Sequence, residues 1–250
     1  MKLFWMSLIF FFGFWACPQE QSEQAAIADE IMQKVEQNLS SENRTFESTM
    51  VIHMRRGKRT VRSKSWSVGD TNAFTEYLAP PREKGVKMLK LGDQLWLYSP
   101  STDRTILISG HMLRQSVMGS DLSYEDMMED PDLNKQYDAQ IVAEESIENT
   151  ECWVLLLKAK VPDLAYQSRK IWVDKARLVP LKEELFAKSG QLLKQTRFSA
   201  FKQFDTRWYP THVHFKDMLK KGEGTEFILN TIEFDTDIPD HIFSKAGLRR

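Results

Sequence analysis

The chain changes its hydrophobic period near residue 44. Within residues 21–39 an apolar side chain recurs at every fourth position from Ile27 to Leu39, which is the spacing of an apolar stripe along one helix face. From residue 44 onward apolar and polar positions alternate, as in FESTMVIHM, and this alternation recurs to the C-terminus. The pattern predicts one N-terminal helix followed by a mainly β structure.

Short turns separate the strand-like segments. GDTN, GDQ, STD, ENTE and KSG are typical hairpin turns, and strands joined this tightly are antiparallel neighbours. About a dozen such strands curl into a barrel or half-barrel that encloses more space than its own side chains fill. After the first alternating segment the candidates are 59–68, 73–78, 86–91, 95–99, 104–109, 135–147, 151–160, 166–174, 178–188, 191–204, 208–218 and 224–235.

One long excursion interrupts the tight turns at residues 109–133. Long excursions in such a chain are usually functional loops or lids. This one mixes acids with methionines, whose flexible side chains suit an adaptable apolar surface. Its candidate lipid-binding residues are Met112, Met118, Met127 and Met128, and the strand aromatics add Trp66, Phe74, Trp96, Trp172 and Phe198.

The acids of this excursion have two interpretations. Ser123 has the spacing of a helix N-cap with Asp126 three residues later, and acids in the first turn favour the helix dipole; Pro131 would end that helix. The alternative is a divalent-cation site, but Asp121, Glu125 and their neighbours lack the alternating ligands and central glycine of a calcium loop. We therefore expect structural caps and no metal or cofactor.

The N-terminus predicts export. Residues 1–16 are one lysine within an almost unbroken apolar run, as in a signal peptide, and are too short to span a bilayer comfortably. Ala16 followed by Cys17 resembles a degenerate lipobox, so residues 17–20 are predicted to be a lipidated tether. A plain secreted protein is the alternative. The second cysteine, Cys152, is expected to be a small buried residue and not a catalytic thiol.

The charge pattern excludes a global nucleic-acid partner. The formal net charge is −1, with no overall basic field. Residues 54–64 nevertheless carry six cations and no acid around Gly57, which indicates a hairpin tip that meets anionic headgroups or an acidic partner, or one that is simply solvated. His212 and His214 share a strand face but have no identifiable third metal ligand.

Four segments together resemble a known family. The segments of the outer-membrane lipoprotein-sorting proteins related to the periplasmic carrier LolA are resembled, in order, by LKLGDQLWLYSPSTDRTILISG, SVMGSDLSYEDM, KIWVDKARLVPLKEELFAKSGQLLKQTRFSAFKQFDTRWYPTHVHF and DTDIPDHIFSKAGL. The likeness covers most of residues 60–248. It implies a mainly β (α+β) fold: an incomplete antiparallel β-barrel, here of about eleven strands, with the N-terminal helix and a short lid helix over an apolar cavity. Residues 21–248 would form this one domain.

The resemblance also implies a function. We expect a periplasmic carrier for lipid or acylated lipoprotein, working with an inner-membrane transporter of the resistance-nodulation-division type. Separately, the lipobox predicts a membrane anchor at Cys17, and Pro18, in place of an aspartate that retains lipoproteins at the inner membrane, favours the outer membrane. The alternatives are a lipid hydrolase on the same fold and an envelope-stress lipoprotein sensor. The chain contains no G-x-S-x-G, HExxH, P-loop or dinucleotide motif, which favours a binding protein over an enzyme.

Overall fold

A computed structural model describes residues 18–130 and 132–249 of the chain. The predicted signal peptide and Cys17 lie outside the described residues, as does Pro131. Within them the helix α1 spans Pro18–Leu39 and precedes thirteen strands. The strands are β1 Asn43–His53, β2 Lys58–Val68, β3 Asn72–Ala79, β4 Lys87–Leu91, β5 Gln94–Ser99, β6 Arg104–Ile108, β7 Tyr137–Ile147, β8 Thr150–Ala159, β9 Ser168–Asp174, β10 Pro180–Phe186, β11 Leu192–Phe204, β12 Arg207–Asp217 and β13 Gly224–Phe234.

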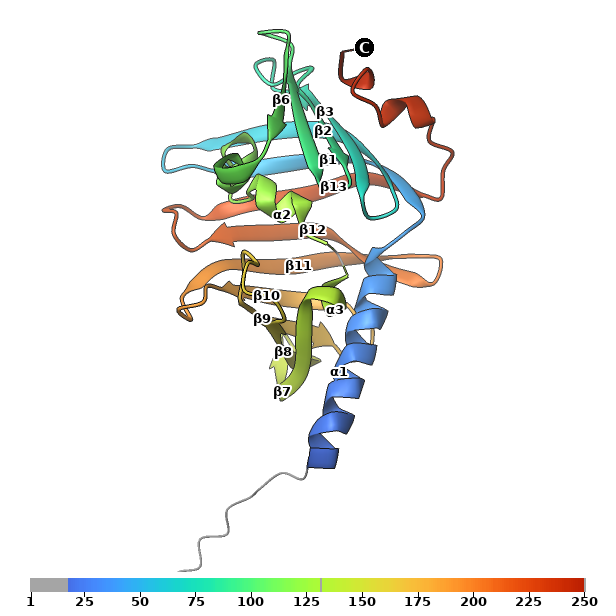
Figure 1. Ribbon diagram of the computed structural model, residues 1–250, viewed down its shortest axis with the longest axis vertical. Helices are drawn as coiled ribbons and strands as arrows, with labels where there is room; N and C mark the ends of the chain where they lie inside the picture. The colour runs from blue at the N-terminus through green and yellow to red at the C-terminus, as the bar shows by residue number, and fades with distance from the viewer. Residues whose placement is uncertain (1–17, 131, 250) are drawn as a thin grey trace, which may run out of the picture.

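The strands form one open antiparallel sheet in the order β6-β5-β4-β3-β2-β1-β13-β12-β11-β10-β9-β8-β7. The mainly β fold and the incomplete barrel are confirmed, with thirteen strands where about eleven were predicted. Every candidate segment pairs with a neighbour, and β1 also pairs with β13. Figure 1 shows the strongly curved sheet, with edge strands β6 and β7.

The excursion joins the two edge strands and folds into short helices. These are η1 Gly110–Arg114, η2 Val117–Gly119, α2 Tyr124–Met128 and α3 Leu133–Gln136. α2 packs over β4–β6, where Tyr124 and Val117 join Met88, Leu95 and Ile108 in one buried cluster. The excursion therefore fills the interior of one half of the sheet (Figure 1).

Helix α1 covers the other half. Its buried stripe includes Ala28, Ile31 and Val35, which pack against Tyr137 of β7, Leu155 of β8 and other buried residues of β7–β9. The four-residue spacing predicted from the sequence is the spacing of this stripe, although Ile27 itself is 43% exposed. No helix in the described part of the chain is long and apolar enough to cross a membrane.

The C-terminal segment lies on the outer face of the sheet. After β13 come two short turns of helix, η3 Asp240–Ile242 and η4 Gly247–Arg249. Leu248 is fully buried against Phe74 and Leu89. Because this segment covers the outer face, strands β2–β5 carry apolar side chains on both faces.

Candidate functional site

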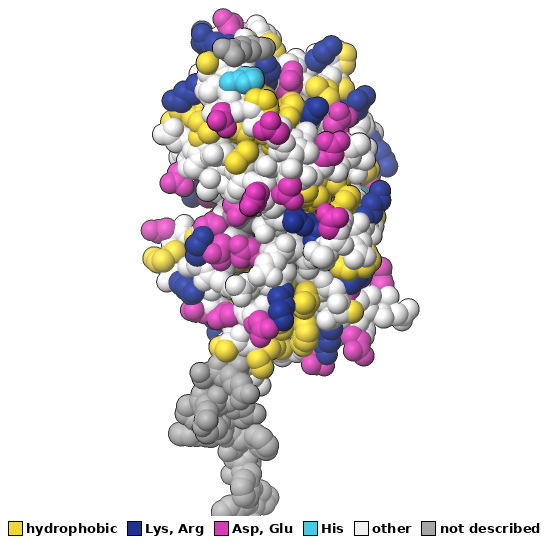
Figure 2. Space-filling view, turned by 90° about the vertical axis from the view of Figure 1, so that its right-hand side faces the viewer, with side chains coloured by type: hydrophobic (Ala, Val, Ile, Leu, Met, Phe, Trp, Pro, Cys, Tyr) yellow, Lys and Arg dark blue, Asp and Glu magenta, His cyan; other side chains and the backbone are white. Residues whose placement is uncertain are grey.

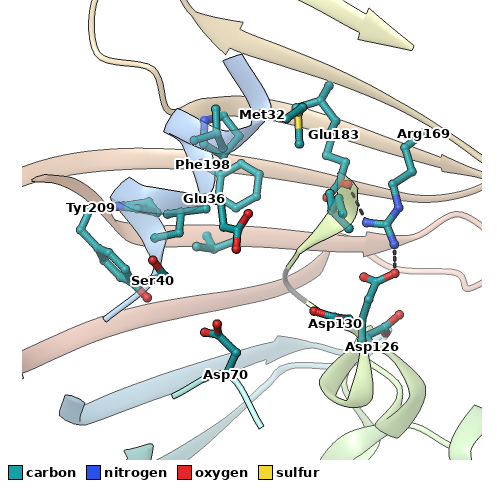
Figure 3. Close-up of a pocket in the computed structure, with 18 of the residues that line it drawn as sticks. Met32, Glu36, Ser40, Asp70, Asp126, Asp130, Arg169, Glu183, Phe198 and Tyr209 are labelled. Carbon is teal, nitrogen blue, oxygen red and sulfur yellow. Dashed lines mark hydrogen bonds and ion pairs between the residues drawn. The ribbon is translucent and has the colours of Figure 1, made fainter. Parts of the chain in front are cut away.

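A cavity of about 440 Å³ lies between the two covering elements. Its walls come from α1, from α2–α3 and from the inner face of β1 and β9–β13 (Figure 3). This volume falls within the roughly 300–1,000 Å³ typical of small-molecule sites. The apolar lining consists of Met32, Val35, Leu39, Phe46, Leu133, Ile171, Pro180, Phe198, Tyr209, Pro210, Val213, Phe215, Phe227 and Leu229.

The register of three strands places aromatic side chains together on the cavity wall. Phe198 of β11 pairs with Val213 of β12, and Val213 pairs with Phe227 of β13. Side chains at directly paired positions point to the same face of an antiparallel sheet. Phe198 and Phe227 are only partly buried although both face inward, because the cavity lies in front of them.

The ladder between β12 and β13 is short, and residues beyond its end line the cavity. It joins only residues His212–Phe215 to Thr225–Ile228. Beyond this ladder Tyr209 and Pro210 on β12, and Leu229 on β13, line the cavity.

Acidic side chains lie on one side of the cavity. Glu36 from α1, Asp70 from the β2–β3 turn and Asp130 after α2 belong to its lining (Figure 3). Burial raises the pKa of the Glu36 carboxyl, and the negative charges of Asp132, Asp70 and Asp130 raise it further. Figure 2 shows acidic side chains spread over one face of the molecule, among Lys and Arg side chains. The cavity thus combines an apolar wall with acidic side chains in its lining.

Arg169, in the cavity lining, pairs with acids from two elements. Its side chain is 3% exposed, pairs with Glu183 of β10 at 2.9 Å and also pairs with Glu129 beside α2. The guanidinium lies 4.8 Å from the ring centre of Tyr137 and 5.5 Å from that of Tyr166, positions that favour a cation. Arg169 therefore ties the end of α2 to the sheet.

Helix α2 in the excursion begins with the predicted helix cap, which the structure confirms. The Ser123 hydroxyl accepts a hydrogen bond from the Asp126 backbone N–H at 3.3 Å, and the Asp126 carboxylate accepts one from the Ser123 N–H at 2.6 Å. This reciprocal pair is a capping box. The helix ends at Met128, before Pro131.

Asp126 also connects the excursion to strand β11 and to the loop between β8 and β9. Its carboxylate accepts a hydrogen bond from the Tyr166 hydroxyl at 2.5 Å and pairs with the Lys194 ammonium of β11. Burial alone would raise the pKa of Asp126, but the Lys194 charge and the hydrogen bonds from Ser123 and Tyr166 hold it below its ordinary value. We call this group, Asp126 with Ser123, Tyr166 and Lys194, the latch.

The remaining carboxylates of the segment point to separate partners. Asp121 accepts hydrogen bonds from the Thr225 hydroxyl at 2.8 Å and from the Asp217 N–H at 3.0 Å, whereas Glu129 pairs with Arg169. A divalent cation needs several oxygen atoms that converge on one point. These carboxylates instead fasten the excursion to different strands.

The structure separates the predicted lipid-binding residues into three places. Of the nine, Phe198 is the residue that lines the described cavity. The four methionines pack against the buried cluster of β4–β6, and Met118 also contacts the cluster of Met50 and Tyr77. The tryptophans and Phe74 lie on the outer face, where Trp66, Phe74 and Trp96 meet the C-terminal segment and Trp172 packs against Cys152 and Val154.

Sequence reasoning missed most of the cavity wall. Phe215, Phe227 and Leu229 were not singled out, although Phe215 and Val213 alternate with His212 and His214 in a recognisable strand. Both histidines take the outer face, where the His212 ring lies 3.1 Å from a Glu226 carboxylate oxygen. Cys152 is fully buried, as predicted, and burial raises the pKa of its thiol.

Comparisons with known proteins agree with this architecture. The chain matches a LolA superfamily protein from Nitrosomonas europaea at 25% identity and a TM-score of 0.73, over 88% of this chain and 98% of that one. A family model described as "-like: Uncharacterized protein" matches residues 69–250. The chain belongs to the family of this model, and its fold is that of the LolA superfamily.

Two further structures share the LolA-like fold. A domain described as an outer membrane lipoprotein-sorting protein, from Vibrio parahaemolyticus, has a TM-score of 0.79 at 24% identity, over 90% of this chain and 100% of that one. A DUF1329 family protein from Desulfovibrio piger has a TM-score of 0.82 at 24% identity, over 90% and 99%. No curated protein matched this chain. The neighbours cover nearly the whole described fold, so the LolA-like architecture extends beyond the segments that first indicated it.

Proposed function

We propose that this LolA-like protein is a periplasmic, non-enzymatic carrier that holds an acyl chain of a lipid or lipoprotein in the cavity between α1 and β9–β13. The observation that carries the proposal is the aromatic wall of Phe198, Phe215 and Phe227, which faces unfilled space. Exposing an acyl chain to water costs about 0.8 kcal/mol per methylene, so a carrier needs such an apolar enclosure. Transfer from a bilayer only exchanges one apolar environment for another, so binding need not be tight.

The excursion is the proposed cover of this cavity. Asp126, Glu129 and Asp130 stand at its edge, while the methionines of the same segment pack over β4–β6. Met112, Met118, Met127 and Met128 would then supply a deformable support that lets α2 shift when cargo enters. A transporter of the resistance-nodulation-division type is the proposed source or acceptor of that cargo, and Cys17 the proposed membrane anchor.

A cavity-filling substitution tests the proposal. Val213→Trp would place an indole between Phe198 and Phe227, whereas Val142→Trp makes the same change at a valine that is 48% exposed on β7. Binding of an environment-sensitive fluorescent fatty acid should weaken by at least about tenfold, or ~1.4 kcal/mol, in Val213→Trp and stay unchanged in Val142→Trp. Circular dichroism checks that both variants fold.

Two results would contradict the proposed carrier function. Equal probe affinity in wild type and Val213→Trp would mean that the acyl chain binds elsewhere or not at all. Release of free fatty acid from an ester-linked probe would support the lipid hydrolase instead.

A further inference from the structure

Two hairpin tips lie side by side at one end of the sheet. The β1–β2 turn covers residues 54–57 and the β12–β13 turn covers 218–223. They are neighbours because β1 pairs with β13, with His53 directly opposite Gly224. Figure 1 shows both tips protruding at the left edge, away from α1.

Both tips expose large apolar side chains. Met54 is 48% exposed, Met218 44% and Leu219 65%. Leu219 has the largest exposed fraction among the large apolar residues of the described chain. Single exposed apolar residues are ordinary, but three on adjacent protruding tips form a patch that marks an interaction surface.

Cations without ion-pair partners flank this apolar patch. Arg55, Arg56 and Lys58 on the first tip and Lys221 on the second are exposed, and none of the four forms an ion pair with a described residue. The nearby acids are already engaged. Glu223 lies 3.4 Å from His53 and Glu83 lies 3.5 Å from Arg59. The tips therefore keep a net positive charge.

We propose that these tips form a docking surface for a bilayer that contains anionic lipids. The docking surface comprises Met54, Arg55, Arg56, Lys58, Met218, Leu219 and Lys221. Apolar side chains beside cations suit the boundary between headgroups and acyl chains, where the apolar groups insert and the cations meet lipid phosphates. An acidic protein partner would use the cations but would not by itself explain the protruding Met54, Met218 and Leu219.

The docking surface is distinct from the cavity lining. Ser40 and Asp70, which belong to the cavity lining, lie at the opposite end of the strands, beside the start of β1 and the β2–β3 turn. A molecule seated on its tips would keep this end free of the membrane. The inference concerns a different surface from the proposed cavity, so either can fail without the other.

Vesicle sedimentation of the chain from residue 18 onward tests the docking surface without the apolar N-terminal run and without an acyl anchor. Binding to phosphatidylcholine vesicles with about one-third phosphatidylglycerol should exceed binding to pure phosphatidylcholine at least tenfold, and should weaken as salt rises. Arg55→Glu/Arg56→Glu/Lys58→Glu should abolish the preference. The matched control Lys158→Glu/Arg197→Glu/Lys202→Glu changes the net charge equally at exposed positions away from the tips and should bind within about twofold of the parent.

A second variant separates insertion from simple charge attraction. Leu219→Ser keeps every cation and should lower vesicle affinity by about tenfold, because it removes the most exposed apolar group. Three results would overturn the proposal: equal binding to neutral vesicles, equal losses in the tip and control triple variants, and absence of vesicle binding by the folded parent. Tip-dependent binding to polyglutamate without vesicle binding would identify an acidic protein as the partner and would also overturn it.

Discussion

Replacing Asp126 with asparagine tests whether the latch holds the excursion to the sheet. One Asp126 oxygen accepts from the Tyr166 hydroxyl at 2.5 Å, and the other accepts from the Ser123 N–H at 2.6 Å and pairs with Lys194. Asparagine keeps the shape but removes the charge. It also turns one acceptor into an NH₂ donor; with the amide oxygen kept toward Ser123 and Lys194, the NH₂ faces the Tyr166 hydroxyl, which must then accept instead of donate.

The expected loss of stability is about 3 kcal/mol. The side chains of Asp126 and Lys194 are 12% and 15% exposed, so water screens their pairing only in part. Removing one partner of a buried ion pair costs about 3–5 kcal/mol, and the partial exposure of both side chains places the loss at the lower end of that range. For a domain of this size, about 3 kcal/mol corresponds to a fall in Tm of roughly 6–12 °C.

Denaturant unfolding followed by tryptophan fluorescence measures this loss. Asp163→Asn is the control, because Asp163 is exposed in the neighbouring β8–β9 loop. The double variant Asp126→Asn/Lys194→Met should be less destabilised than the sum of the two single variants, since no unpaired ammonium then stays buried. A loss below about 1 kcal/mol for Asp126→Asn, or an additive double variant, would refute the reasoning.

Three further predictions follow from the cap, the depressed pKa and the N-terminal motif. Ser123→Ala should destabilise the protein by about 1 kcal/mol in the same unfolding assay, and an unchanged midpoint would contradict the capping role. The pKa of Asp126 lies below its ordinary 3.8, so its stabilising contribution is complete above that value and is lost as pH falls through the lower folded-state pKa. Wild type should therefore lose more stability in acid than Asp126→Asn, with the two stabilities converging; parallel pH profiles would show that the carboxylate is not the titrating group. Metabolic labelling with an alkynyl fatty acid should mark the wild type and not Cys17→Ser, and undiminished label in Cys17→Ser would contradict the predicted acylation of Cys17.

The strands were predictable because their signal is local. An alternation of period two needs only adjacent residues, and each candidate segment corresponds to an observed strand within two residues at either end. The capping box was equally readable, since Ser123 and Asp126 are three residues apart. Features that depend on residues close in sequence could therefore be predicted from the sequence alone.

The orientation of the strand aromatics could not be predicted in the same way. Trp66 and Ser65 alternate on β2, which would normally place Trp66 inside. Here Ser65 faces inward and forms a hydrogen bond with Thr75 at 2.9 Å, while Trp66 packs against Phe74 on the outer face. The cause is distant in sequence, because Leu248 of the C-terminal segment covers that outer face.

The excursion is attached to the sheet in two different ways, and this bears on the proposed opening of the cavity. Its methionines pack on β4–β6 through apolar contact, whereas its acidic side is held by Asp126–Lys194 and Glu129–Arg169. When the cavity opens, both charges of an ion pair become hydrated again. Opening therefore costs far less free energy than the Asp126→Asn substitution, which leaves one charge buried without its partner. Lifting the methionine side would expose apolar surface to water, and no favourable hydration would offset that cost. We therefore expect the acidic side of α2 to lift from the cavity while the methionine side stays packed and acts as the hinge.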